Sequence, residues 1–348
     1  MKENLFIKKG YNKDEVIQTG HQFLLGNGHI GYRGTLEEDT KEDMVGFNLV
    51  GVYDQYQDKW RESLNLPNPL FCKICREEKE ISVKQSKYKK HEIQLDITNG
   101  LFKRITKYND LIFSSTRFIT FDSDLLIEKI TIKTLKTLNL KIRMGLDTDI
   151  YESNGPHYVN KEVENIGNDI IFIGTTNEGK KIYQRNKYLL PENLKKRYLD
   201  GGFDIFYVSH GKEELTFYIA SKVVNSKEEE FDFDYTKAYE THLLTFKKKW
   251  ENSLIELKGN KEISFALKYS VYHLLILGDE YRNNSIPARG VSGQVYKGAI
   301  FWDTEMFMMP FYNLTNPHIS RKLIEYRIKT LPGAISKAKE FGYQGAFY

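Results

Sequence analysis

The sequence has little cysteine and no long apolar run, and each absence excludes a class of protein. Its two cysteines, Cys72 and Cys75, are too few for a disulfide-stapled secreted fold, and this lone C-x-x-C supplies half of a four-ligand zinc site. No apolar run approaches the ~20 residues that a membrane span needs. The start, MKENLFIKKG, carries charge where a signal peptide needs an apolar segment. We therefore expect a cytoplasmic protein with buried free thiols, no metal and no membrane partner.

A strong charge of one sign is also missing. The net charge is +4 over 348 residues, and Lys and Arg are interspersed with Asp and Glu. Nucleic-acid binding needs a concentrated positive patch, so the short runs KKRYLD and KKKW are interpreted as solvated faces, and no nucleic-acid partner is expected. At this length a single hydrophobic core usually stops growing, which favours two domains.

Short segments that alternate between apolar and polar residues dominate residues 76–225. KEISVKQSKYK, HEIQLDI, LFKRITKY and LIFSSTRFITF each follow a period of two and are separated by turn residues. Such segments at regular spacing are typical of an antiparallel β-sandwich. The dipeptide Asn99-Gly100 between two of them predicts a hairpin.

The pattern becomes helical after Asn225. Residues 226–258 are first acidic and then basic, with apolar residues at helical spacing, and predict a linker helix. A second helix is predicted from Lys261 to about Gly278, and a third from about His318. Pro332 interrupts the third pattern, so we expect a kink or a restart there.

One motif imitates a dinucleotide-binding fingerprint. GNGHIG, from Gly26 to Gly31, satisfies G-x-G-x-x-G, and Asp54 follows at a distance typical of the acidic residue in that motif. The motif requires a helix whose N-terminus faces the pyrophosphate, but the segment YRGTLEEDTKEDM that follows has no apolar face for a helix to bury. We interpret GNGHIG as a strand and turn and expect no nucleotide cofactor.

The run FWDTEMFMMPFY, residues 301–312, is the strongest candidate for a site, although its apolar residues also suit a core helix. Trp302 next to Asp303 would leave a charge in a dry core, whereas an indole beside a carboxylate can hold a sugar ring. Asp303 and Glu305 are too close in sequence to flank a glycosidic bond as an acid and base pair. The Gly-rich loop before them brings three further candidates: Arg289, Tyr296 and Lys297.

Three histidines, His21, His29 and His157, could border a pocket. Scattered histidines are more often hydrogen-bonded structural residues, and none of these has the spacing of metal ligands.

The chain resembles the phosphorylases of glycoside hydrolase family 65, which act on kojibiose, nigerose, maltose, trehalose and related α-glucosides. The matching stretches lie in family order over nearly the whole chain: LGNGHIGYRGTLEE, VGVYD, LNLPNPL, IPARGVSGQVYKGAIFWDTEMFMMPFY, YRIKTLPGAISKA and GYQGAFY. The resemblance implies a β + α multidomain protein. Residues 1–225 would form an N-terminal antiparallel β-sandwich (a supersandwich), residues 226–258 a helical linker, and residues 259–348 the truncated start of an (α/α)6 catalytic barrel.

The resemblance also implies inverting phosphorolysis, in which inorganic phosphate is a co-substrate and no other cofactor takes part. Trp302 and Asp303 would contact the non-reducing glucose, with the loop carrying Arg289, Tyr296 and Lys297 as weaker candidates. The general acid, a Glu, and the phosphate loop lie beyond Tyr348 in the family pattern. We therefore expect no catalytic residue in this chain, no turnover by it alone, a complementary C-terminal fragment as a partner, and a homodimer in the complete enzyme.

The chain departs from the family pattern at Val295 and Ala299, where Gly and His are usual, so the resemblance leaves the glycosidic linkage open. Two alternatives remain. One is a non-catalytic carbohydrate-binding or assembly subunit, and the other is a fragment of an α-glucoside hydrolase of the same fold, such as a trehalase.

Overall fold

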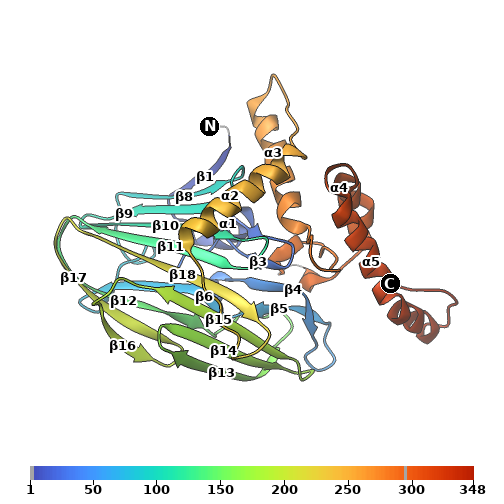
Figure 1. The fold of residues 1–348 in the computed structure, drawn as a ribbon, viewed down its shortest axis with the longest axis horizontal. Helices are drawn as coiled ribbons and strands as arrows, with labels where there is room; N and C mark the ends of the chain where they lie inside the picture. The colour runs from blue at the N-terminus through green and yellow to red at the C-terminus, as the bar shows by residue number, and fades with distance from the viewer. Residues whose placement is uncertain (1–3, 294–295) are drawn as a thin grey trace.

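The strands form three antiparallel sheets in a computed structural model that describes residues 4–293 and 296–348 (Figure 1). Within these residues the largest sheet has nine strands, in the order β1 (Leu5–Lys9), β8 (Lys90–Asp96), β9 (Leu101–Lys107), β10 (Leu111–Ile119), β11 (Leu126–Thr134), β18 (Glu214–Val224), β15 (Lys181–Leu189), β14 (Asp169–Thr176) and β13 (Tyr158–Ile166). The second sheet has the order β16 (Lys195–Leu199), β17 (Gly202–Gly211), β12 (Lys136–Asp147), β6 (Asn68–Arg76) and β7 (Lys79–Glu80). The third has the order β2 (Leu25–Gly26), β3 (Ile30–Tyr32), β4 (Phe47–Asp54) and β5 (Glu62–Leu66).

The predicted β-sandwich is confirmed, and its strands follow the predicted alternation. In β10, Leu111, Phe113 and Ser115 are buried while Ile112 and Ser114 between them are partly exposed, because successive side chains of a strand point to opposite faces. The hairpin at Asn99-Gly100 is also confirmed. Gly100 closes it at φ +62°, a left-handed conformation that glycine adopts without a steric penalty.

The linker helix α2 (Tyr235–Glu251) packs across the nine-stranded sheet (Figure 1). Its N-terminus is capped by the Asp234 carboxylate, which accepts from Lys237 N at 3.0 Å. Aromatic residues of the helix, Tyr235 and Tyr239, pack on a buried cluster that includes Phe118. The apolar face predicted from the sequence therefore covers the sheet.

The next helix, α3 (Lys261–Leu277), joins the helical part to the third sheet. Asn260 caps its N-terminus, and Tyr272 donates its hydroxyl to Leu24 O at 2.9 Å. Gly28 turns the chain between β2 and β3 at φ +88°, so GNGHIG is a strand and turn, as predicted. The short helical elements of the described chain are α1 (Val16–Gln22), η1 (Lys13–Glu15), η2 (Lys41–Asp43), η3 (Gly290–Ser292) and η4 (Tyr296–Gly298).

The C-terminal helices extend away from the sheets (Figure 1). A π-helical turn, η5 (Thr304–Met308), leads into α4 (Met309–Thr315) and α5 (Pro317–Glu340). The helix α5 continues through Pro332, so a restart there is wrong. The segment that follows α5 contacts the turns after Pro332. Tyr343 N donates to Ala338 O and Phe347 N donates to Ala334 O, each at 2.8 Å.

The described helices include none that is long and apolar enough to cross a membrane. Cys72 is buried on β6 and Cys75 is partly buried, and both thiols are free.

Candidate functional site

Trp302 and Asp303 lie where the loop after α3 enters the π-helical turn η5. The neighbouring Thr304 is buried and donates its hydroxyl to Ile286 O at 2.8 Å, which fixes the start of this turn. The Trp302 side chain is 53% exposed, so the alternative of a sealed core does not hold for it. Asp303 is partly exposed, and in the described part of the chain no group donates to its carboxylate. The pair therefore presents a half-exposed aromatic ring beside a carboxylate that accepts from no group in residues 4–293 and 296–348.

Arg327 of α5 holds this turn in place. Its Nε and Nη2 donate to the Glu305 carboxylate at 2.6 and 2.8 Å, and its Nη2 also donates to Phe301 O at 2.9 Å. The guanidinium lies 4.6 Å from the centre of the Trp302 ring, a favourable cation–π distance. The hydrogen bond to Glu305 raises the pKa of Arg327 above its ordinary value. Both carboxylate oxygens of Glu305 are thus engaged by Arg327, which ties this side chain to α5.

Tyr348 completes the surroundings of the indole. Its ring meets Trp302 edge to face at 5.7 Å, and its hydroxyl donates to Arg327 O. Arg327 and Tyr348 were not predicted from the sequence as site residues. Both lie in stretches that carry the family resemblance, YRIKTLPGAISKA and GYQGAFY, but nothing in the spacing shows that they converge on Trp302.

The three candidates of the loop before Trp302, namely Arg289, Tyr296 and Lys297, have different surroundings in the structure. Tyr296 is exposed and meets Phe301 edge to face at 5.8 Å, next to the Trp302 turn. Lys297 points to the β-sandwich, where its Nζ donates to Asn154 Oδ1. Arg289 is exposed on the side of α1, and burial together with the charges of Arg33 and Arg289 lowers the pKa of His21 to about 4.

The two departures from the family pattern lie in this loop. Val295 is outside the described residues. Ala299 donates its N–H to Tyr296 O at 2.8 Å and accepts from Ala288 N at 3.0 Å, so its backbone closes the Tyr296–Gly298 turn.

The histidines His29 and His157 are hydrogen-bonded, as the structural interpretation predicts. His29 Nδ1 lies 3.2 Å from Asp124 Oδ2. His157 lies between Asp54 Oδ2 at 3.1 Å and Glu62 Oε2 at 3.0 Å. Among the described residues no group of three or more His, Cys, Asp or Glu side chains is arranged to hold a metal ion.

An exposed apolar face surrounds the Trp302 turn and runs along α4 and α5. Phe307 is 74% exposed and Leu314 is 88% exposed, values unusual for large apolar side chains. The other members of this face are Phe301, Met306, Ile324, Ile328, Leu331, Ile335 and Phe341. Large apolar side chains that stay exposed along neighbouring elements are typical of surfaces that other polypeptide segments cover.

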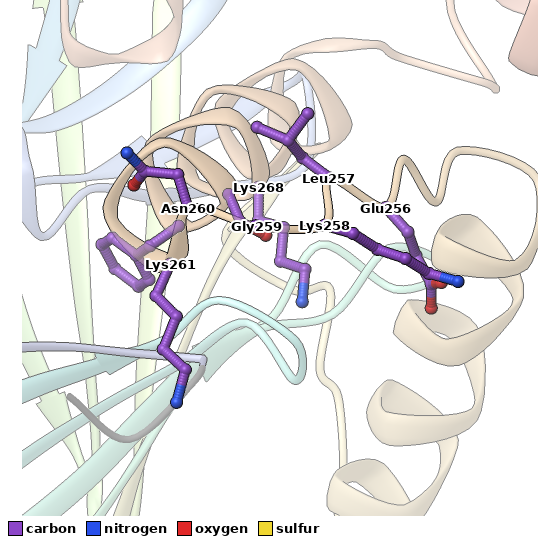
Figure 2. Close-up of a pocket in the computed structure, with 9 residues that line it drawn as sticks. Glu256, Leu257, Lys258, Gly259, Asn260, Lys261 and Lys268 are labelled. Atoms are coloured by element: carbon purple, nitrogen blue, oxygen red, sulfur yellow. The ribbon is translucent and has the colours of Figure 1, made fainter.

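Two hollows of the protein lie away from the Trp302 turn. Figure 2 shows a pocket of about 200 Å³ at the loop between α2 and α3, lined by residues that include Lys258, Lys261 and Lys268. A groove of about 490 Å³ beside α2 is lined by Leu244, Trp250 and other residues. Trp302 and Asp303 line neither of them.

Comparison with known proteins places the chain in a family. The N-terminal domain of glycosyl hydrolase family 65 matches residues 6–189, and the central catalytic domain of the same family matches residues 268–348. Nigerose phosphorylase of Lachnoclostridium phytofermentans is 33% identical over 97% of this chain and 51% of its own length. The 1,2-alpha-glucosylglycerol phosphorylase of Bacillus selenitireducens is 27% identical over 98% of this chain and 48% of its own length.

A solved structure from the human microbiome that carries the name of a kojibiose phosphorylase shares the fold. Its TM-score is 0.87 at 19% identity, over 99% of this chain and 51% of that structure. The chain spans about half the length of the curated relatives it matches. The N-terminal domain match alone covers more than half of the 348 residues. This protein therefore belongs to glycosyl hydrolase family 65.

Proposed function

We propose that this chain forms the glucosyl-binding part of an inverting α-glucoside phosphorylase. The observation that carries the proposal is the half-exposed Trp302 indole beside the Asp303 carboxylate, which has no donor among the described residues. An indole covers the apolar C–H face of a pyranose, and a free carboxylate accepts hydrogen bonds from its hydroxyl groups. The relatives named above are phosphorylases, which supports the same class of reaction.

In this reaction a protonated glutamic acid donates its proton to the glycosidic oxygen while phosphate attacks the anomeric carbon from the opposite face. The bond between that carbon and the leaving oxygen breaks, and a bond to a phosphate oxygen forms. The products are β-glucose 1-phosphate and a free sugar. Phosphate is already an anion, so no general base is needed. Trp302 and Asp303 hold the non-reducing glucose, and Arg327 keeps the indole oriented.

We assign the general acid and the phosphate site to barrel helices that cover the exposed apolar face. Side chains such as Phe307 and Leu314 suit the packing between neighbouring helices of a barrel and have no cover in the described chain. In this arrangement residues 1–225 are the sandwich domain, residues 226–258 the linker and residues 259–348 the first part of the barrel. The chain alone then has no turnover, and the complete enzyme is a homodimer.

Sugar binding tests the role of Trp302 directly. Calorimetric titration of the chain with nigerose and kojibiose should show that Trp302→Ala weakens binding about tenfold, the order of magnitude of losing a stacked aromatic contact. Trp60→Ala is the matched control, since Trp60 is 83% exposed on the sandwich and should leave affinity unchanged. Equal affinity in both variants and the wild type would remove Trp302 from the site.

Turnover tests the proposed reaction. The chain is assayed with nigerose, kojibiose, maltose and trehalose, with and without phosphate, first alone and then with a polypeptide that carries the remaining barrel helices. We expect phosphate-dependent release of glucose 1-phosphate only in the second case. Turnover by the chain alone contradicts the assignment of the acid to other helices. Cleavage without phosphate indicates a hydrolase, and sugar binding without any cleavage indicates a binding or assembly subunit.

A further inference from the structure

We propose that His157 is a positioning residue of the sugar site. His157 lies as an imidazolium between Asp54 and Glu62 and orders a loop of the sandwich. Asn154 of this loop binds Lys297 and so holds the turn before Trp302. We call the connected residues Asp54, Glu62, His157, Asn154 and Lys297 the latch. The latch rests on contacts within the described chain, and its effect on sugar binding rests on the proposed function. No sequence motif marks it, because its parts come from β4, β5, the loop after β12 and the loop after α3 (Figure 1).

The two carboxylates beside His157 are buried and saturated with donors. Asp54 accepts from Asn177 Nδ2 at 2.8 Å and from Glu178 N at 2.9 Å, in addition to His157 Nδ1. Glu62 accepts from Ser153 Oγ at 2.7 Å and from Asn154 N at 2.9 Å, in addition to His157 Nε2. Carboxylates with several donors stay ionised, so each ring nitrogen of His157 faces an anion and both must donate. The geometry therefore requires the charged form of the ring.

Asn154 connects this cluster to the site. Its backbone N–H donates to Glu62, its Nδ2 donates to Trp60 O at 2.8 Å, and its Oδ1 accepts from Lys297 Nζ. The Asn154 side chain is 95% buried by these contacts, since only 5% of the residue is exposed. A change that loosens the loop therefore releases the ammonium group of Lys297.

The same two strands hold the turn that Lys297 occupies. Tyr53, next to Asp54, donates its hydroxyl to Gly298 O at 2.8 Å. Ser63, next to Glu62, lies so close to Gly298 that a Cβ at position 298 would come 2.4 Å from Ser63 Oγ. Lys297 itself has φ +56°, a conformation that a non-glycine residue keeps only when its surroundings hold it. The turn thus depends on the sandwich for its shape.

From this turn the chain leads within a few residues to Trp302. Ala299 N donates to Tyr296 O, and the Tyr296 ring meets Phe301 edge to face at 5.8 Å. Phe301 O in turn accepts from Arg327 Nη2, the group that covers the Trp302 ring. The latch and the indole are therefore joined by continuous contacts.

The charge of His157 sets the pH range of the latch. Burial lowers the pKa of its imidazole, but hydrogen bonds to Glu62 and Asp54 and the charge of Glu152 outweigh burial, so the pKa is raised. The charged groups around the cluster are Asp54 from β4, Glu62 from β5 and Glu152 from the same loop. Lys161 of β13 acts on Glu152, and Lys297 of the loop after α3 donates to Asn154. Because the folded pKa is raised, the clamp is complete below the ordinary pKa near 6.5 and is lost as pH rises through the folded value.

Nitrogen NMR of the full chain with labelled histidine tests the charge. The ring of His157 should stay doubly protonated above the ordinary histidine pKa near 6.5. A His157 ring that is neutral at pH 6 overturns the proposal.

Hydrogen exchange at the Ala299 amide tests the connection. Asn154→Ala leaves the imidazolium clamp intact but cuts the link to Lys297, and it should speed this exchange about tenfold without moving the His157 titration. His157→Gln should speed it by a similar factor. It should also remove the part of the rise with pH that exceeds the base-catalysed increase common to all amides, while His210→Gln is the control that changes neither. Unchanged exchange in Asn154→Ala refutes the latch even if His157→Gln fails to fold.

Titration with nigerose at pH 6 and pH 9 then separates the two proposals. A latch that positions the site gives Asn154→Ala a weaker affinity than the wild type at pH 6, and the affinity of the wild type falls as pH rises through the folded pKa of His157. If the wild type binds no sugar at either pH, the proposed function fails, while the exchange data still decide the latch. Equal sugar affinity in Asn154→Ala and the wild type at pH 6 refutes the positioning role.

Discussion

The ion pair between Arg327 and Glu305 makes the sharpest prediction, because it joins α5 to the turn that carries Trp302. Arg327→Met removes both hydrogen bonds to the carboxylate and the cation over the indole, while the methionine side chain keeps much of the volume. Glu305→Gln removes the charge from the other side. Together the two single variants and the double variant form a thermodynamic cycle that isolates the pair.

The magnitude follows from burial and geometry. The two side chains are only 13% and 14% exposed, and the contacts at 2.6 and 2.8 Å form a parallel pair of charged hydrogen bonds. A hydrogen bond to a charged group contributes about 1.5–3 kcal/mol, whereas an exposed ion pair contributes at most about 1 kcal/mol. Since the Arg327 pair is partly buried, we expect a coupling energy of about 2 kcal/mol in the free energy of unfolding.

The assay is urea unfolding followed by tryptophan emission, with a control pair on the same helix. Arg321 Nε lies 3.2 Å from Glu325 Oε1, but the Arg321 side chain is 78% exposed. The corresponding cycle for Arg321→Met and Glu325→Gln should give a coupling of at most about 0.5 kcal/mol. Arg327→Met should also shift Trp302 emission to longer wavelength, because water replaces the guanidinium on the ring. Equal coupling energies in the two cycles would refute the view that Arg327 organises the site.

Two further predictions concern stability. Gly31→Ala should destabilise the protein by about 2 kcal/mol or more, because a Cβ there would lie 2.1 Å from Val291 O. Gly333→Ala is the control, since a Cβ at that position meets no atom within 4 Å. Equal melting temperatures for the two variants would contradict this prediction. Burial lowers the pKa of His91 to about 3 and of His242 to about 4, so the unfolded chain binds protons that the folded chain excludes, and stability should fall as pH drops below 6.5. The loss should reach about 2 kcal/mol per histidine at pH 5, and unfolding at several pH values should show a shallower slope for His242→Gln; an unchanged slope would show that His242 does not carry this dependence.

Local pattern was sufficient to predict the strands and the main helices. The alternation in LIFSSTRFITF predicts β10, and Asn99-Gly100 predicts the hairpin between β8 and β9. Each signal lies within one segment of the sequence. The division into three sheets was beyond reach, since β1 pairs with β8 and β18 inserts between β11 and β15. Such partners are set by packing between distant segments. Pro332 shows the same limit, because the local rule predicts a kink or a restart there, whereas α5 runs through it from Pro317 to Glu340.

The exposed position of Trp302 could be predicted from the sequence, but the residues that support it could not. Trp302 and Asp303 stand out because an aromatic ring next to a charge is uncommon in a core. Arg327 lies 22 residues from Glu305, and Asn154 lies 143 residues from Lys297, so no spacing rule connects either pair. Arg289 and Lys297 are near Trp302 in sequence. The Lys297 ammonium group nevertheless contacts Asn154 of the sandwich, and the charge of Arg289 acts on His21 of α1.

The place of β18 in the nine-stranded sheet has a consequence for synthesis on the ribosome. This strand is the last of the sheet in sequence, yet it lies between β11 and β15, so the two parts of the sheet remain separate until residues 214–224 have emerged. The surface on which α2 packs includes Ala220 of that strand and is therefore incomplete before then. Nascent chains that stop short of β18 should expose unpaired strand edges and bind holding chaperones, whereas chains that extend past α2 should escape them.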